Sequence, residues 1–110
     1  MAKKSRGRKE QEQIEGLTSL VDHLYIDSFR NLEYEKGEMD YVGVLDDGRW
    51  DVYEVKSSWK GVKRAVEQLY TAKRYFKSRC RNTLVYVGQE NYFFQVHFPT
   101  CSQTKKVSFK

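Results

Sequence analysis

Apolar residues recur at helical spacing in two segments of the chain. Steps of three and four residues predict a first helix from about residue 9 to about residue 28, with a buried stripe of Ile14, Leu17, Val21 and Leu24. The same spacing predicts a second helix from Trp59 to about Arg79, with a stripe of Val62, Ala65, Val66, Leu69, Ala72 and Phe76. Each helix is expected to pack one face against the rest of the protein.

Four further segments alternate apolar and polar residues in the manner of strands. Two of them, Met39 to Leu45 and Arg49 to Ser57, are rich in Val, Tyr and Trp and flank Asp46-Asp47-Gly48, so they predict a hairpin. Two more strands are predicted from Leu84 to Gly88 and from Tyr92 to Phe98. Residues 31 to 36 are expected to be a short extended or looped passage, and residues 100 to 110 carry no assignment.

The resulting order, α-β-β-α-β-β, is that of an α/β fold in which helices flank a central mixed β-sheet. The 110 residues match a common single-domain size, so residues 10 to 110 are expected to form one domain. Residues 1 to 9 are basic with little to anchor them, which predicts a flexible basic arm. No apolar segment follows this arm, so a secretory signal is not expected and the protein is placed in the cytoplasm.

Composition and charge narrow the functional classes. Hydrophobic residues make up 39% and charged residues 32% of the chain, which favours a globular domain over a disordered chain or a membrane span. The net charge is +5, but residues 10 to 54 hold 13 acidic and 3 basic side chains, whereas residues 55 to 110 hold 2 acidic and 12 basic ones. This separation suits a divalent cation on one side and a polyanion on the other, or two halves that neutralise each other.

Several other chemistries find no support in the sequence. Cys80 and Cys101 lack the spacing of a zinc site and are expected to be reduced thiols. No nucleophilic triad, phosphate-binding loop or glycine-rich dinucleotide turn is present, so no organic cofactor is expected. Seven aromatic residues are expected to pack in the core and between strands rather than to stack on bases: Tyr41, Trp50, Tyr53, Trp59, Tyr92, Phe93 and Phe94.

The length of the hairpin loop decides which side chains share a face of the sheet. A two-residue Asp47-Gly48 turn would place Asp40 opposite Val55 and send the acidic residues of the two strands to opposite faces. A three-residue loop, with Gly48 in the left-handed position, would place Asp40 opposite Glu54. In that second register Glu38 would also meet Lys56.

The three-residue loop would gather ionisable side chains at the end of the hairpin away from its loop. Asp40 and Glu54 would then be candidate ligands of Mg²⁺, which takes one or two carboxylates together with waters and substrate phosphate. Lys56 would lie on the same face, where it could orient or help to deprotonate an attacking water and stabilise charge on the phosphate. The alternative is a ladder of ion pairs across a half-exposed sheet, which would contribute little to stability.

These residues resemble the PD-(D/E)XK nuclease superfamily, most of all its small archaeal Holliday-junction-resolvase-type members. The similarity is carried by Gly37-Glu38-Met39-Asp40 followed, fourteen positions after Asp40, by Glu54-Val55-Lys56. It implies a restriction-endonuclease-like core, a catalytic Mg²⁺ or Mn²⁺ held by Asp40 and Glu54, and a catalytic role for Lys56. The pattern is short, and Met39 stands where many members have proline.

The resemblance also implies supporting residues outside the hairpin. A glutamate of the first helix often joins the metal in such nucleases, and Glu10 is the best candidate here, with Glu12 and Glu15 left open. A glutamine on the second helix often supports the site, which suggests Gln68, although a surface glutamine would look the same. Glu38 is the other candidate supporting residue.

Basic residues of the second helix supply a candidate surface for DNA. Nine Lys and Arg residues and a single acidic one, Glu67, lie from Lys56 to Arg81. The candidate phosphate contacts are Lys60, Lys63, Arg64, Arg74 and Lys77. The sequence thus predicts a nuclease that recognises the structure or the ends of DNA, as a homodimer if both strands are cut. An inactive nucleic-acid-binding module on the same fold and a charged adaptor protein are the alternatives.

Overall fold

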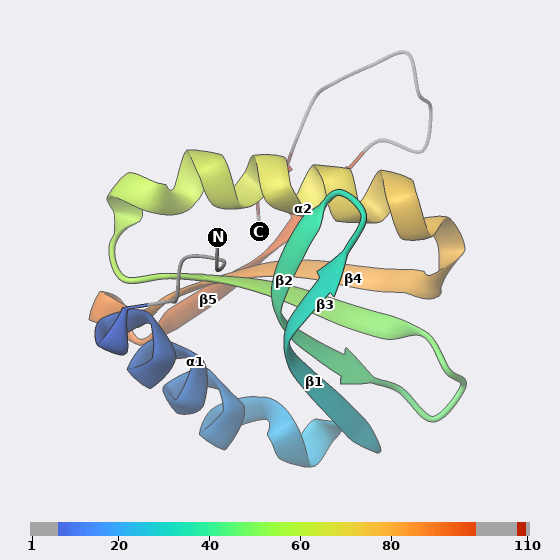
Figure 1. Ribbon diagram of the computed structural model, residues 1–110, viewed down its shortest axis with the longest axis horizontal. Coiled ribbons are helices and arrows are strands. Elements are labelled where there is room, and N and C mark those ends of the chain that lie inside the picture. Colours follow the sequence, from blue (N-terminus) through green and yellow to red (C-terminus); the bar gives the residue numbers. More distant parts are fainter. Residues whose placement is uncertain (1–6, 99–107, 110) are drawn as a thin grey trace, which may run out of the picture.

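The computed structural model describes residues 7–98 and 108–109, which form two helices and one mixed sheet (Figure 1). In chain order the elements are α1 (Arg8–Val21), β1 (Asp27–Tyr34), β2 (Gly37–Val44), β3 (Trp50–Lys56), α2 (Val62–Phe76), β4 (Cys80–Val87), β5 (Tyr92–His97) and β6 (Ser108–Phe109). Single 3₁₀ turns cover residues 22–24, 59–61, 77–79 and 88–90. The sheet has the order β1-β2-β3-β4-β5-β6, and β3 and β4 are its parallel pair, joined through α2. The expected α/β class with a mixed sheet is therefore confirmed.

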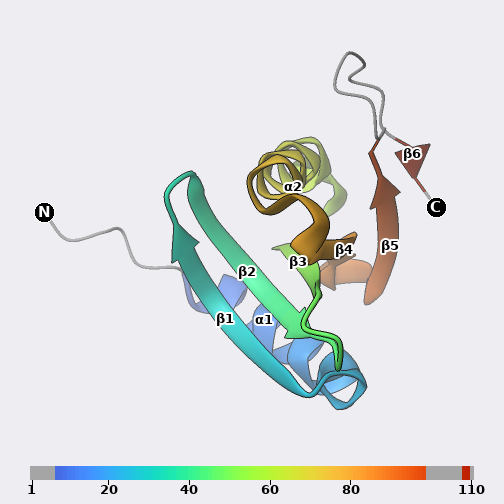
Figure 2. The ribbon, with the colours of Figure 1, turned by 90° about the vertical axis from the view of Figure 1, so that its right-hand side faces the viewer.

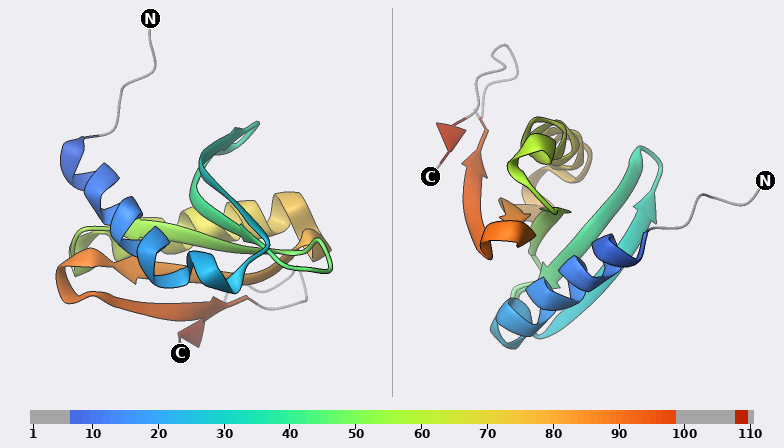
Figure 3. Two further views of the ribbon diagram at one scale, coloured as in Figure 1. Left: turned by 90° about the horizontal axis from the view of Figure 1, so that it is seen from below. Right: turned by 90° about the vertical axis from the view of Figure 1, so that its left-hand side faces the viewer.

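The two helices cover opposite faces of the sheet (Figure 3). The stripe of α1 packs with Tyr41, Tyr53, Val55 and Tyr86 on one face. The stripe of α2 packs on the other face, in a cluster that contains Met39, Val42, Val52, Ala65, Leu69, Ala72, Val85, Val87, Phe94 and Val96. Because β3 alternates between these two clusters, each of its side chains is assigned to one helix layer.

The N-terminal third of the chain differs from the expectation. The first helix ends at Val21 rather than near residue 28, and Leu24, the fourth member of the expected stripe, is 58% exposed. An eight-residue strand, Asp27–Tyr34, then forms an edge of the sheet where a helix end and a short loop were expected. The expected order α-β-β-α-β-β therefore lacks β1, and it also lacks the two-residue β6, which lies in the segment without an assignment. An edge strand buries few side chains, and β1 therefore shows no clean alternation of apolar and polar residues.

The basic arm overlaps with the first helix. Because α1 begins at Arg8, Arg8 and Lys9 belong to this helix rather than to an arm of nine residues. Residues 1–6 lie outside the described residues, as does Cys101. Cys80 is buried as a free thiol against α2.

The β2–β3 hairpin has the three-residue loop. The amide of Leu45 donates to the carbonyl of Arg49 over 2.8 Å, and the amide of Gly48 donates to the carbonyl of Leu45 over 2.9 Å. Gly48 has a φ of 87°, the left-handed conformation that glycine adopts without steric penalty. The pairs Val44–Trp50 and Val42–Val52 follow in register, so the predicted alignment of the two strands is confirmed.

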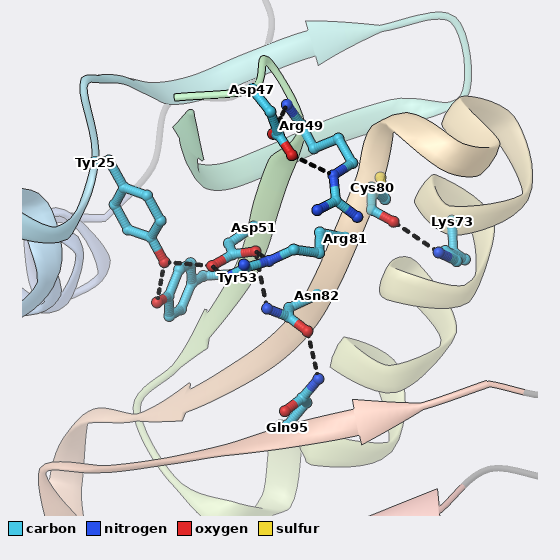
Figure 4. A network of polar contacts seen from close by, with 10 residues as sticks. All are labelled: Tyr25, Asp47, Arg49, Asp51, Tyr53, Lys73, Cys80, Arg81, Asn82 and Gln95. Carbon is cyan, nitrogen blue, oxygen red and sulfur yellow. Dashed lines mark hydrogen bonds and ion pairs between the residues drawn. The ribbon is translucent and has the colours of Figure 1, made fainter. Parts of the chain in front are cut away.

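A polar network holds the amino end of β3, close to the hairpin loop (Figure 4). The carboxylate of Asp51, only 4% exposed, accepts hydrogen bonds from Tyr25 Oη at 2.8 Å and Asn82 Nδ2 at 3.1 Å. The Arg81 guanidinium lies 3.4 Å from the same carboxylate. Burial, more than the Tyr25–Tyr53 hydrogen bond and the Asp51 charge, raises the pKa of the Tyr25 hydroxyl above its usual value. Asp51 thus has hydrogen-bond partners and a structural role. It lies at the amino end of β3, whereas Lys56 lies at the carboxyl end.

Within residues 7–98 and 108–109, neither helix combines the length and the apolar character needed to cross a bilayer.

Candidate active site

The candidate site begins where β2 and β3 separate. The ladder between these strands ends at the Tyr41–Tyr53 pair, and the next residues in the same register are Asp40 and Glu54. There the Oδ2 atom of Asp40 accepts a hydrogen bond of 2.7 Å from the backbone N–H of Val55, in place of a further strand-to-strand bond. This bond fixes the Asp40 carboxylate beside the segment that carries Glu54. The structure therefore brings together the first two predicted site residues.

Both carboxylates are almost completely buried. Asp40 is 2% exposed and Glu54 is 1% exposed. The alternation of the strands places Asp40 with Val42 and Glu54 with Val52, on the face that α2 covers. Ionised groups at this depth occur in proteins where they are paired or coordinate a metal ion.

Tyr34 of β1 lies near the buried Glu54 carboxylate and packs against α2. Burial raises the pKa of the Tyr34 hydroxyl, and the nearby negative charge of Glu54 raises it further. The Tyr34 ring packs against Tyr75 of α2, with a centroid distance of 5.1 Å. The tip of the β1–β2 hairpin consequently lies against the middle and end of α2 (Figure 2).

The space between that hairpin tip and α2 is a cleft of about 270 Å³. Its walls are formed by Tyr34, Lys36, Gly37, Glu38, Arg64, Glu67, Gln68 and Thr71. Both predicted supporting residues, Glu38 and Gln68, thus lie in one cleft. Among the described residues, the Oε1 atom of Gln68 is buried and accepts no hydrogen bond.

Glu38 does not meet Lys56 as expected. Its partner in the sheet is Glu33 of β1, because the β2–β3 ladder stops before it reaches Glu38. The two strands separate at Asp40, and the Asp40 carboxylate fills the gap by bonding to Val55.

Lys56 is held by its stem at the start of α2. A Cβ atom added to Gly61 would lie 2.8 Å from Cδ and 3.0 Å from Cγ of Lys56, so the aliphatic stem occupies the place of a Gly61 side chain. Lys56 follows Glu54 by two residues and shares its face. The start of α2 therefore restrains the aliphatic stem of Lys56.

The contact with Gly61 gives a testable consequence. Gly61→Ala is expected to displace the Lys56 stem and to reduce metal-dependent DNA cleavage by roughly tenfold or more, because small misplacements of catalytic groups are costly. Stability should change little, since Gly61 has φ −89°, which alanine adopts readily.

Gly16→Ala is the matched control, because a Cβ atom at Gly16 would meet only Tyr86 Oη, at an ordinary 3.8 Å. Cleavage rates and thermal melts of both variants provide the comparison. Equal cleavage by the two variants would contradict the proposed positioning of Lys56.

The expected glutamate from α1 does not complete a three-carboxylate site. Within residues 7–98 and 108–109, no three His, Cys, Asp or Glu side chains gather closely enough to hold a metal ion. The apolar stripe of α1 packs on the face of the sheet opposite to Asp40 and Glu54, and Glu12 and Glu15 are exposed. Among the described residues, the half-buried Glu10 is not gathered with Asp40 and Glu54 in a group of three metal-ligand side chains, and its part in the site stays a prediction.

The remaining pair of carboxylates still fits Mg²⁺ or Mn²⁺. Mg²⁺ takes hard oxygen ligands, keeps several waters and is commonly bound through one or two carboxylates plus substrate phosphate. Asp40 and Glu54 supply such oxygens on adjacent strands, and the Val55 amide holds the Asp40 carboxylate in place.

The predicted DNA contacts all lie on the surface. Lys60, Lys63 and Arg64 are exposed at the start of α2, and Arg74 and Lys77 are exposed at its end. Of these five, Arg74 donates to Tyr70 Oη at 3.1 Å and lies over the Tyr70 ring. Three other cations of this region are engaged in the fold: Lys73 donates to the Cys80 carbonyl, Arg79 lies over Trp50, and Arg81 contacts Asp51.

Three of the aromatic residues expected to pack in the core and between strands have ring contacts but are largely exposed. Trp59 is 49% exposed and Tyr92 is 48% exposed, and Phe93 is also exposed, whereas Tyr41, Tyr53 and Phe94 are buried as expected. Aromatic residues in a strand pattern indicate burial only on average, so the sequence carried no signal for these exceptions.

Comparisons with known proteins give few matches. No model of a known protein family and no curated protein matches this chain. The crystal structure of a repair endonuclease from Pyrococcus abyssi is similar, with a TM-score of 0.47 and 17% identity over 83% of this chain and 42% of that one. The structure of an EndoMS–dsDNA2 complex is similar with a TM-score of 0.45 and 14% identity, over 74% of this chain and 37% of the other. This chain spans less than half the length of either protein, and its chemistry has to be argued from its own residues.

Proposed function

We propose that this protein is a nuclease that uses Mg²⁺ or Mn²⁺ to hydrolyse phosphodiester bonds in DNA. The observation that carries the proposal is the position of Asp40 and Glu54, two buried carboxylates on adjacent strands. Asp40 accepts a hydrogen bond from the amide of Val55, the chain neighbour of Glu54, and Lys56 follows on the same face as Glu54. The resemblance of this Asp, Glu-x-Lys pattern to the PD-(D/E)XK nucleases agrees with the proposal, and so does the α/β fold with its mixed sheet.

Asp40 and Glu54 are the residues that hold the cation. When bound, a divalent cation supplies Lewis-acid stabilisation of charge on the phosphate and a more acidic water. Lys56 orients the attacking water and neutralises charge that develops on the phosphate. Gln68 and Glu38 line the adjoining cleft, where the Gln68 amide positions substrate or water by hydrogen bonds.

The exposed cations of α2 hold the DNA backbone. Lys60, Lys63 and Arg64 lie nearest to the site, at the start of the helix, and Arg74 and Lys77 extend the surface to its other end. Contacts of this kind release counterions, so binding is expected to weaken as the salt concentration rises. Contacts to phosphates do not distinguish one base sequence from another. We therefore expect the protein to recognise the structure or the ends of DNA, as Holliday-junction resolvases do. A homodimer would allow both strands to be cut.

A cleavage panel tests this function. Plasmid DNA, linear duplex, branched DNA, single-stranded DNA and RNA are incubated with the protein in Mg²⁺, in Mn²⁺ and in EDTA. We expect cleavage of at least one DNA form in either metal and none in EDTA. DNA binding without cleavage in any metal would favour an inactive nucleic-acid-binding module, and the absence of both cleavage and salt-dependent binding would favour an adaptor protein.

A further inference from the structure

An exposed pair of aromatic rings adjoins the candidate site. Trp59 follows Lys56 by three residues, and its ring centroid lies 6.0 Å from that of Tyr92, at the start of β5. About half of each side chain is exposed. Trp59 and Tyr92 together form what is called here the aromatic shelf. The starts of α1, α2 and β5 meet at the same end of the molecule (Figure 1).

The aromatic shelf is rigid on its inner side. The Trp59 ring stacks on the buried Phe94 ring, with an interplanar angle of 6° and a centroid distance of 5.7 Å. The turn that carries Trp59 is closed by backbone hydrogen bonds on both sides: Gln89 N–H donates to the Ser57 carbonyl, and Gly61 N–H donates to the Ser58 carbonyl. With its inner face against Phe94, the Trp59 ring can accept another flat ring only on its exposed side.

A cationic cleft flanks the aromatic shelf. The cleft has a volume of about 430 Å³ and is lined by Lys9, Gln13, Ser57, Ser58, Lys60 and Gln89. Ser58 and Lys60, two of its lining residues, are the chain neighbours of Trp59. Two ammonium groups and two hydroxyl groups suit a phosphate, and a flat exposed ring suits a nucleobase.

We propose that the aromatic shelf binds an unpaired nucleobase, and that the substrate of this protein therefore contains a single-stranded stretch of DNA. The inference rests on the proposed nuclease function. It adds the class of substrate that the site takes. A base inside a duplex is already stacked on both sides and cannot cover Trp59, whereas an unpaired base can, while its phosphate lies in the Lys9–Lys60 cleft. Order along the chain supports this, because Lys56, the cleft serines and Trp59 follow one another without interruption.

Binding in EDTA tests the aromatic shelf without cleavage. A fluorescein-labelled oligothymidylate and a duplex of the same length are titrated with the full chain by fluorescence anisotropy. Trp59→Leu keeps apolar contact with Phe94 but removes the ring, and it is expected to weaken single-strand binding about tenfold while changing duplex binding less than about twofold. Trp59→Phe keeps a ring and should restore most of the single-strand affinity.

Two controls separate stacking from other effects. Phe29→Leu alters an aromatic side chain of similar exposure, 39%, on the edge strand β1, and should leave both affinities unchanged. An oligonucleotide with the same backbone but no bases should bind wild type and Trp59→Leu equally. Equal weakening of single strand and duplex by Trp59→Leu, or no weakening of either, would overturn the inference. A change in self-association with both DNA affinities intact would make the shelf a protein contact and would overturn it as well.

The two proposals fail in different ways. Trp59-dependent single-strand binding without cleavage in any metal would overturn the nuclease function and leave the aromatic shelf standing. Metal-dependent cleavage that does not depend on Trp59 for any single-stranded substrate would overturn the shelf and leave the nuclease standing.

Discussion

Replacing Asp40 by Asn, or Glu54 by Gln, is expected to reduce metal-dependent DNA cleavage by about a thousandfold. Each substitution preserves size but exchanges a carboxylate for an amide, a far weaker ligand for Mg²⁺. Folding should survive, because an amide oxygen at position 40 can still accept the hydrogen bond from Val55, and because each change removes one anion from a buried position. Cleavage rates in Mg²⁺ and thermal melts in EDTA measure the two effects.

Asp46→Asn is the matched control for these variants. Asp46 is an exposed carboxylate in the loop of the same hairpin, at the end away from the candidate site. The Asp46→Asn variant should cleave DNA at the wild-type rate. Undiminished cleavage by both Asp40→Asn and Glu54→Gln would remove these residues from the catalytic site.

The largest loss of stability is expected at the other end of β3. Asp51→Ala should reduce the free energy of unfolding by about 3 kcal/mol, because it leaves Tyr25 and Asn82 without their shared acceptor in a buried site. The Arg81 contact is longer, at 3.4 Å, and Arg81 is partly exposed, so it contributes the smaller part. Urea unfolding gives the change as a shift of the midpoint at constant slope.

Asp47→Ala provides the comparison for Asp51→Ala. Asp47 forms an ion pair with Arg49 at 2.8 Å, but both side chains are about half exposed (Figure 4). Its removal should leave the unfolding midpoint close to that of wild type, since exposed ion pairs contribute little. Equal midpoints for the two variants would show that the Asp51 network does not stabilise the fold.

The register of the site could be predicted because it depends on a local feature. Once Gly48 closes a three-residue loop, the register of the ladder from Val44–Trp50 to Tyr41–Tyr53 is fixed, and this register places Asp40 and Glu54 on one face. The sequence left a two-residue turn open as well, and only the hydrogen bonds around Leu45 decide between the two.

The errors arose where tertiary contacts outweigh local pattern. Leu24 continues the spacing of α1, but the α-helix ends at Val21 and the chain goes on to form an edge strand that is only partly buried. The place of Glu10 in the site stays a prediction, because spacing within a helix cannot reveal which face of the sheet that helix will cover.

The buried Asp51 network was not predicted for a related reason. Its members come from separate parts of the chain, from Tyr25 before β1 to Asn82 in β4, and no spacing links them. The exposure of Trp59 escaped prediction because an aromatic residue next to a strand carries the same pattern whether its outer face is covered or open.

Calorimetric titration with Mn²⁺ tests the central claim, that Asp40 and Glu54 jointly bind one divalent cation, without any nucleic acid. We expect one site in the wild-type protein, with affinity at least about tenfold weaker in both Asp40→Asn and Glu54→Gln and unchanged in Asp46→Asn. No binding by wild type, or equal affinity in all four proteins, would contradict the claim and leave the two carboxylates a structural role only.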